Sequence, residues 1–509
     1  MSRKKEVLIN VSPGETRVAL IEDGRLSEVI YDRARPDDDA PSACRLESHV
    51  NSIVLGRVTR VLPGVQAAFV EIGLERAGFL SAREARRIAV DYMGEEPNSR
   101  VPPISELVRE GDEVLVQIIK DPIGDKGARL TAGPTLPGRH VVMVPNSNLA
   151  ALSRRIEDEA DRERLLAVIA RLQQRGRDQG IQSGFIARTA ALDATEHELE
   201  EDADRLWQQW REITERRAKA SPPTHLHRNL GILALTLRDH VDRDTIRVLI
   251  DDAAAFAEAK RYAQSVLPDL AGRIELYQDR SPLFHLYNVE DEIDQSMEGR
   301  ASLPSGGWIT VETTEAMTSI DVNSGSLEAG CLAETALRTN VEAAHEIARQ
   351  LRLRGIGGLI VADFIHLETP ECVEKVMAVL RAAFANDRTP VQITEMSEFG
   401  LVEITRKRVR EPLGRLLTGP CPTCRGQGRM RSAGTVANDV LRRVQAEAQA
   451  APGRAIRVRV APEVGAWITA RSHSVLEPLR ERVGQNLRVD VIRHYARERF
   501  DVEAVREPA

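Results

Sequence analysis

Two apolar segments of the 509-residue chain each end in an aspartate. The first reads TSIDVNSG and carries Asp321 and Asn323, which share one side of a strand because strand side chains alternate between faces. The second reads GGLIVAD and ends in Asp363. If two neighbouring strands carry these segments, Asp321 and Asp363 meet beyond the strand ends, where sites gather in α/β sheets.

Such a carboxylate pair predicts a cation. Two carboxylates this close repel each other, so that one keeps its proton unless a cation lies between them. Mg²⁺ suits the pair because it takes hard oxygen ligands and retains several waters. It can activate water and stabilise charge on a phosphate during an in-line displacement. The alternative is that both aspartates are helix caps or turn residues, and the spacing alone leaves this open.

A pair of thiols, Cys421 and Cys424 in PCPTCRGQG, indicates a second chemistry. Two thiolates on one tight turn suit tetrahedral Zn²⁺, but structural zinc takes four ligands and the chain has no second Cys-x-x-Cys. Either the pair is redox-active, or each of two chains donates half of a four-thiolate site. We favour the shared site, because no thioredoxin-like pattern surrounds the pair.

Nucleic-acid contacts are suggested by aromatic and basic side chains. Phe69 and Phe79 lie on predicted strands, where they either pack in a core or stack on bases. Residues 401–430 hold a basic run that suits phosphate contacts. The Arg188-Thr189 pair, and Arg154-Arg155, are further candidates, since a guanidinium beside a hydroxyl can bind a terminal phosphate. The basic side chains of the run are Arg406, Lys407, Arg408, Arg410, Arg415, Arg425 and Arg429.

The composition limits the class of protein. With 70 Lys and Arg against 77 Asp and Glu, the net charge is −7, which excludes nucleic-acid binding by bulk positive charge. Five Cys in a chain of this length make no disulfide framework. No stretch approaches the roughly 18 apolar residues of a membrane span, and no apolar signal region follows the basic start. We therefore expect a reduced, cytoplasmic protein.

The elements that must position these residues follow from hydrophobic period and turn signals. The first 31 residues predict three strands whose sheet is completed by chain from elsewhere. Closely spaced strands over 50–122 favour an OB-type barrel, and Thr195-x-x-Glu198 opens an amphipathic helix. Short strands over 230–237 and a helix over 251–265 come next. Residues 300–418 then alternate strands and helices, which predicts a layered α/β domain, and the tail is a small α/β domain.

The chain resembles the ribonuclease E/G family over nearly its whole length. The tail ends soon after the cysteine pair and the small domain, which favours the shorter of the family's two types. The most specific matches are IDVNSG, GGLIVADF and CPTCRGQG, and the others are LINVSPGETRVALIEDGRL, RVTRVLPGVQAAFVEIGLERAGFL, KGARLT, SRRIE, GFIARTA and FGLVEITRKR.

The resemblance implies a multidomain α/β architecture. An RNase H-like domain would be split by an inserted S1 RNA-binding barrel and a 5′-sensor region. A DNase I-like catalytic domain, a zinc-link and a small C-terminal α/β domain would follow. The expected bounds are 1–37 with 233–296 for the split domain, 38–122 for the barrel, 123–232 for the sensor, 297–418 for the catalytic domain, 419–428 for the zinc-link and 429–509 for the small domain.

The resemblance also implies roles for residues. Asp321 and Asp363 would hold the catalytic Mg²⁺, and Asn323 would orient the attacking water or the scissile phosphate. Cys421 and Cys424 would supply half of a Zn²⁺ site shared between chains. The other implied residues are Phe69, Phe79 and Lys126 for RNA in the channel, and Arg188, Thr189, Gly138 and Val142 for the RNA 5′-monophosphate.

One residue departs from the family pattern near the second aspartate. The family has an acidic residue three positions after Asp363, where this chain has His366. One negative charge fewer near the ion predicts weaker Mg²⁺ binding or an altered pH dependence.

The sequence therefore predicts a Mg²⁺-dependent, single-strand-specific endoribonuclease, stimulated by a 5′-monophosphate. We expect water, activated by the ion, to attack the phosphorus in line, since no paired histidines suggest a metal-free route through the 2′-hydroxyl. Maturation of ribosomal RNA, decay of messenger RNA and a zinc-linked homodimer or tetramer are what the resemblance implies. The alternatives are a non-catalytic, zinc-linked RNA-binding scaffold and a thiol redox protein.

Overall fold

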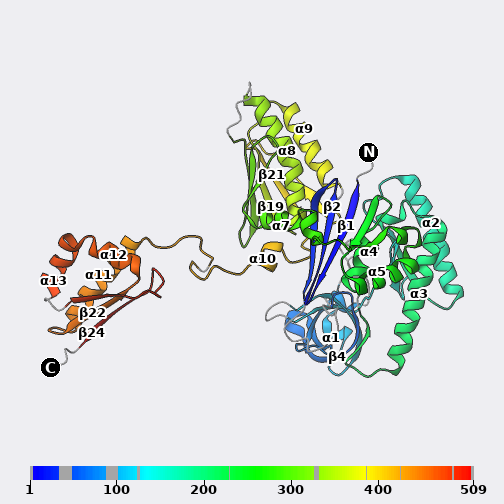
Figure 1. The fold of residues 1–509 in the computed structure, drawn as a ribbon. Helices are drawn as coiled ribbons and strands as arrows, with labels where there is room; N and C mark the ends of the chain where they lie inside the picture. Colours follow the sequence, from blue (N-terminus) through cyan, green and yellow to red (C-terminus); the bar gives the residue numbers. More distant parts are fainter. Residues whose placement is uncertain are drawn as a thin grey trace. The chain divides into compact units, whose positions relative to one another are not determined.

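The structure is a computed structural model of the chain (Figure 1). It describes residues 4–33, 49–86, 101–122, 127–228, 230–325, 332–385, 387–424, 426–483 and 487–505. The chain divides into two units, residues 1–413 and 414–509, which are described separately.

A five-stranded sheet combines the first strands of the chain with two much later ones. Its order is β15-β14-β1-β2-β3, in which β1 pairs with β14 in parallel and with β2 in antiparallel fashion. The expectation that later chain completes the first sheet is confirmed. The elements are β1 (Lys5–Ser12), β2 (Glu15–Glu22), β3 (Arg25–Arg33), β14 (Thr245–Ile250) and β15 (Ile274–Leu276), with α4 (Ile232–His240), α5 (Ala253–Val266), α6 (Leu283–Leu286) and α7 (Val289–Met297).

The strands predicted over 230–237 are wrong, because this segment begins helix α4. Its buried residues Leu233 and Leu237 lie on one helical face and pack in the cluster that contains Val7 and Ile9 of β1. The apolar residues of this segment are so closely spaced that they fit both the period of a strand and the period of a helix. The pattern alone therefore does not distinguish the two, and packing against the sheet selects the helix.

The segment from β4 to β8 forms a closed five-stranded barrel. Neighbouring strands follow the order β4-β5-β6-β8-β7, and an additional β4–β7 pairing closes the ring. Gly78 of β6 is closely packed, since a Cβ there would lie 2.5 Å from the side chain of Leu130, which would have to shift. The strands are β4 (Ile53–Leu62), β5 (Ala67–Glu71), β6 (Gly78–Ser81), β7 (Glu113–Lys120) and β8 (Arg129–Thr131), and β13 (Thr224–His227) adds to the outer side of β4.

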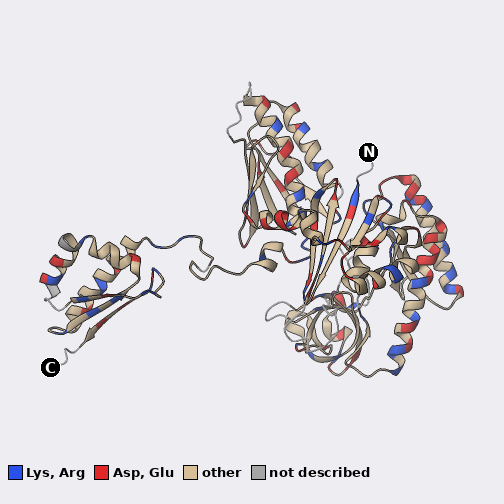
Figure 2. Cartoon of the chain, viewed as in Figure 1, with Lys and Arg blue, Asp and Glu red and all other residues tan. Residues whose placement is uncertain are grey.

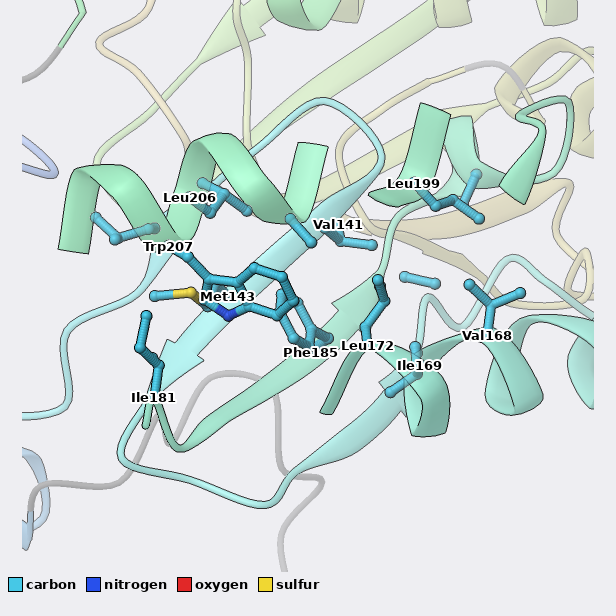
Figure 3. Packing of buried hydrophobic residues seen from close by; sticks show 14 of the residues in the cluster. Val141, Met143, Val168, Ile169, Leu172, Ile181, Phe185, Leu199, Leu206 and Trp207 are labelled. Carbon is cyan, nitrogen blue, oxygen red and sulfur yellow. The ribbon is translucent and has the colours of Figure 1, made fainter. Parts of the chain in front are cut away.

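A four-stranded sheet with two long helices follows the barrel. The predicted capping box is confirmed: the Thr195 side chain accepts from the N–H of Glu198, and the Glu198 carboxylate accepts from the N–H of Thr195. Both helices cover the face that carries Met143 and Phe185, where Trp207 is buried and donates its ring N–H to Ser183 (Figure 3). The elements are β9 (Leu136–Pro137), β10 (Val141–Pro145), β11 (Ala150–Leu152), β12 (Ser183–Ala187), α2 (Glu159–Asp178) and α3 (Glu196–Lys219).

The outer surfaces of these helices are charged. Figure 2 shows acidic and basic residues interspersed along α2 and α3, as expected for amphipathic surface helices. No helix in the described ranges is both long and apolar enough to cross a membrane.

A six-stranded sheet carries both aspartates, with helices against one face. Its order is β16-β17-β18-β19-β21-β20, and β18 and β19 are the parallel neighbours. Ile320, Ile360 and Ile404 point into the core formed with α8 and α9, while the alternate residues of each strand lie on an open face. The elements are β16 (Arg300–Ser302), β17 (Trp308–Thr313), β18 (Met317–Asn323), β19 (Gly358–Asp363), β20 (Val391–Ile393), β21 (Leu401–Arg406), α8 (Leu332–Leu353) and α9 (Pro370–Phe384).

The second unit is a small α/β body, as expected for the tail. Its three-stranded sheet has the order β23-β22-β24, with β22 parallel to β23 and antiparallel to β24. Val440 and Val444 of α11 pack on Val458 of β22. The elements are α11 (Ala433–Ala450), β22 (Ala455–Val460), α12 (Pro462–Thr469), α13 (Glu477–Val483), β23 (Leu487–Val491) and β24 (Phe500–Val505).

Candidate active site

Asp321 and Asp363 lie side by side on the open face of the six-stranded sheet. They are directly paired in the parallel register of β18 and β19, and both side chains are exposed. Paired positions on adjacent strands are about 4.8 Å apart, and their side chains leave the sheet on the same face. The Nδ2 of Asn323 donates a 2.8 Å hydrogen bond to Oδ2 of Asp321, so the amide fixes one carboxylate and keeps its own oxygen available.

The chain around the pair is held by close backbone approaches. Gly325 has a φ of +68°, and a Cβ there would lie 2.8 Å from the carbonyl oxygen of Gly306, so the turn after Asn323 requires glycine. Buried Asn340 of α8 donates to the carbonyl of Ile365 at 2.7 Å and accepts from the N–H of Ile365 at 3.0 Å. The chain after β19 is therefore anchored to α8, and the turn after β18 is packed against Gly306.

The carboxylate pair fits a hard divalent cation. Within the described ranges, neither aspartate forms an ion pair with Lys, Arg or His, so two neighbouring acidic groups lack a protein counter-charge. No group of three or more His, Cys, Asp or Glu suited to a metal occurs in the part of the chain that the structure describes. Mg²⁺ is commonly held by one or two carboxylates and completes its shell with water and substrate phosphate, so this donor set suits it.

Phe69 and Phe79 form a pair on the outside of the barrel. They face each other across β5 and β6, with ring centroids 6.1 Å apart in an edge-to-face arrangement. Their neighbours Ala68, Val70 and Leu80 fill the interior, whereas the two rings are half-buried and lie outside that core. An outward aromatic pair is the geometry needed for stacking on bases. Lys126 lies outside the described residues.

The residues expected at the RNA 5′ end are neighbours. Arg188 donates to the carbonyl of Gly138 at 2.6 Å, and Thr189 shares a 3.2 Å hydrogen bond with Ser153. Buried Val142 lies on β10, whose pairing with β12 brings the start of the strand next to Arg188. Gly138 is packed against Asp202, since a Cβ there would lie 2.4 Å from its carboxylate.

Arg188 also has an acidic partner that the sequence did not suggest. Its guanidinium bonds to Asp239 at 2.7 Å, and Arg238 binds the same carboxylate at 2.7 Å. Although burial opposes ionisation, the bonds from Arg238 and then Arg188 hold the pKa of Asp239 well below its usual range. A phosphate at Arg188 therefore has to share this guanidinium with Asp239.

Replacing Asp239 by asparagine should make stability depend on pH in a defined sense. The folded pKa lies below the unfolded value, so the carboxylate stabilises the fold above that value and loses this effect as the pH falls below about 4. We expect Asp239→Asn to lower the free energy of unfolding by about 3 kcal/mol at pH 7, because two arginines lose their shared partner. Urea unfolding at pH 7, 5 and 3.5 should show the difference shrinking at the lowest pH; a constant difference would contradict the assignment.

The predicted basic run is partly structural. Arg406 is buried and paired with Asp387 at 2.7 Å, and Arg410 donates to the carbonyls of Val29 and Arg352. For these two side chains the expectation of phosphate contacts is wrong, because their donors are already used inside the fold. Exposed basic side chains of the run are Lys407, Arg408, Arg415 and Arg429, and Arg425 lies outside the described residues.

Cys421 and Cys424 lie on one turn of the second unit. Gly426 follows with a φ of +85°, which returns the chain, and the N–H of Gln427 donates to the carbonyl of Cys424 at 2.9 Å. Hydrogen bonds from the Cys424 and Thr423 backbones lower the pKa of the Cys421 thiol, which favours the thiolate form that metals bind. Two thiolates on such a turn suit Zn²⁺ but fill only half of its tetrahedral shell.

The sequence interpretation missed two side chains beside the carboxylates. Trp308 pairs with Asn323 across β17 and β18, and the guanidinium of Arg300 lies 3.6 Å from the centre of its ring. The sequence did contain a signal for Trp308. If the successive strands 308–313 and 317–323 pair as a hairpin, Trp308 lies opposite Asn323. His366 is exposed three residues beyond Asp363.

Comparison with known proteins gives consistent matches along the chain. A family model described as "Ribonuclease E/G family" matches residues 135–409, and one described as "RNase E/G, Thioredoxin-like domain" matches residues 420–505. The second description departs from our interpretation that no thioredoxin-like pattern surrounds the cysteines.

Relatives align over almost the whole chain. Ribonuclease G of Haemophilus influenzae is 38% identical over 98% of this chain and 99% of its own length, and Ribonuclease G of Escherichia coli is 37% identical over the same shares. Ribonuclease E of Haemophilus influenzae is 35% identical over 94% of this chain but only 50% of its own length. These alignments confirm the resemblance, including the expectation of the shorter type. The chain belongs to the ribonuclease E/G family of endoribonucleases.

Proposed function

We propose that the chain is a Mg²⁺-dependent endoribonuclease that hydrolyses single-stranded RNA, leaving a 3′-hydroxyl upstream and a 5′-phosphate downstream. The observation that carries the proposal is the register that pairs Asp321 with Asp363 on an open sheet face without a protein counter-charge among the described residues. Precursors of ribosomal RNA and messenger RNA in the cytoplasm are the substrates that we propose, following the family resemblance.

The three polar residues divide the work at the scissile phosphate. Asp321 and Asp363 would hold Mg²⁺ through their carboxylate oxygens. When bound, the ion supplies Lewis-acid polarisation of the phosphate and a more acidic water. Asn323 holds the Asp321 carboxylate by its N–H and presents its oxygen to the attacking water or to the phosphate. The open face of the six-stranded sheet can accept an extended RNA strand without rearrangement of the protein core.

The preference for single strands rests on the barrel. Phe69 and Phe79 offer two outward rings, and bases can stack on them only when they are unpaired. We assign these rings, together with Lys126, to the RNA channel. A duplex buries its base faces and cannot use such a surface.

The 5′ end is assigned to the pocket around Arg188. Arg188 and Thr189 would bind a terminal monophosphate by charge-assisted hydrogen bonds, with Gly138 and Val142 forming the wall. A triphosphate is bulkier and more highly charged, so a pocket shaped for one phosphate discriminates against it.

Defined oligonucleotides test the activity and the 5′ pocket together. RNA with a 5′-monophosphate should be cleaved in Mg²⁺ and not in its absence, and faster than the same RNA with a 5′-triphosphate. Arg188→Ala should reduce this preference by about tenfold, the effect of losing one charge-assisted contact. The readout is the ratio of kcat/KM for the two RNAs.

Arg177→Ala is the matched control, because Arg177 is an exposed arginine of α2 whose guanidinium bonds to Gln174 and to no acidic group in the described part of the chain. It should leave the ratio unchanged. An unchanged ratio in Arg188→Ala would remove the 5′-pocket assignment, and cleavage without divalent ions would remove the Mg²⁺ assignment.

We further propose that Cys421 and Cys424 of two chains share one Zn²⁺ and so form a homodimer, or a tetramer built from such dimers. The lowered pKa of Cys421 and the two-thiolate turn support this assembly.

A further inference from the structure

We propose that Arg300, held against Trp308, binds an RNA phosphate next to the scissile one. This inference rests on the proposed function and adds a contact residue and a positioning residue to it. It starts from an exposed guanidinium stacked on an aromatic ring at the edge of the carboxylate pair.

Strand register places these residues on the catalytic face. Arg300 is opposite Thr310, and Thr310 is opposite Asp321, so the three lie in one row that continues to Asp363. The neighbours of these residues along their own strands, Ala301, Ile309 and Val322, are buried on the other face of the sheet. Two strand spacings separate Arg300 from Asp321, about 10 Å between backbones, which the nucleotide next to the cleaved bond can bridge.

The ring and the guanidinium form a preorganised unit. The Cζ of Arg300 lies 3.6 Å from the centre of the Trp308 ring. A Cβ at Gly325 would lie 3.4 Å from the edge of the same ring, so the turn after Asn323 packs against it. The ring covers one side of the guanidinium, and the N–H groups at the edge of the guanidinium are the donors that can form a phosphate fork.

The charge of the face favours a role for Arg300 in binding RNA. Arg300 is the single basic side chain on the open face of β16 to β21, and all residues of these strands are described. The same face carries Glu312 and Glu403 besides the two aspartates, and this acidic surface repels RNA. Within the described part of the chain, Arg300 has no acidic partner, so its donors are available to a ligand.

Neutralisation of single phosphates tests the contact. The probes are 5′-monophosphorylated RNA oligonucleotides in which one of the two linkages flanking the cleaved bond is a neutral methylphosphonate. With normal RNA, Arg300→Gln should lower kcat/KM about tenfold and reduce the slope of log kcat/KM against log salt by about 0.7. With one of the two neutral probes, wild type and Arg300→Gln should be cleaved equally.

Further variants separate contact from structure. Arg300→Lys should restore the salt slope, because it keeps the charge. Trp308→Leu should reduce kcat/KM about threefold with an unchanged salt slope, because the charge remains while its platform is lost. Lys375→Gln is the control for loss of one charge, since Lys375 is exposed on α9, behind the sheet, and should match wild type.

Equal activity of Arg300→Gln and wild type on normal RNA, or the same tenfold loss with both neutral probes, would overturn the proposal. Absence of Mg²⁺-dependent cleavage by the wild-type protein would instead refute the proposed function, so the two failures are distinguishable.

Discussion

Replacing Asp363 by asparagine is expected to lower kcat for RNA cleavage by roughly 10³-fold or more while RNA binding persists. Asparagine has almost the shape of aspartate and fits the same exposed strand position opposite Asp321. It cannot supply the second negative oxygen donor, so the pair no longer attracts a divalent cation. Single-turnover cleavage and fluorescence anisotropy with a labelled RNA measure the two properties separately.

The same variant should carry a stability signature that a structural aspartate would not show. Like charges directly opposite each other on adjacent strands destabilise a sheet by roughly 0.2–1 kcal/mol. Without Mg²⁺, Asp363→Asn should therefore unfold at the same or a slightly higher urea concentration than wild type. Mg²⁺ at 100 times its Kd should stabilise wild type by about 2.7 kcal/mol and have little effect on the variant.

Glu403→Gln is the matched control for this experiment. Glu403 lies on the same open face of β21, opposite Val361, and is exposed. Its neutralisation removes one negative charge without touching the strand ends, so activity should stay within a few-fold of wild type. If Asp363→Asn still cleaved RNA, the metal assignment would be refuted. If wild type bound RNA without cleaving it, the chain would be an RNA-binding scaffold.

The carboxylate pair was accessible to sequence analysis because it depends on local patterns. A buried apolar strand with an acidic residue at its end is visible in the letters alone, and two such strands in an alternating α/β region tend to be neighbours. The capping box at Thr195 was accessible for the same reason. Each strand end and the capping box are decided by residues within a few positions of one another, whereas the meeting of Asp321 and Asp363 was an expectation from the tendency of such strands to be neighbours.

The partners of the arginines were not accessible, because they are distant in the chain. Arg406 reaches Asp387, Arg410 reaches the backbone of Val29, and Arg188 reaches Asp239. A run of basic letters gives no information on which side chains are turned inward. The Arg300–Trp308 stack combines both cases, since strand order predicts its location whereas the contact between the side chains needs the structure.

Replacing Cys421 by serine is expected to abolish zinc binding and to convert the assembly to monomers. In a site shared by two identical chains, one substitution removes two of four ligands. Structural zinc contributes about 10–16 kcal/mol in small zinc-dependent domains, so losing even part of this energy weakens association by several orders of magnitude. Zinc per chain, from elemental analysis, should fall from about one per two chains to almost none, and the mass from light scattering should fall accordingly.

Cys372→Ser is the control, because Cys372 is a half-buried free thiol of α9 in the other unit and should be irrelevant to zinc and to assembly. Chelation of zinc from wild type should reproduce the Cys421→Ser mass. One zinc per chain in a monomeric wild type would exclude the shared site. An activity that survives chelation but is lost in Cys421→Ser would instead indicate thiol redox chemistry. The lowered pKa of the Cys421 thiol suits that chemistry as well as it suits zinc binding. The zinc content, the mass and the effect of chelation on activity together therefore distinguish a shared zinc site from a redox-active thiol pair.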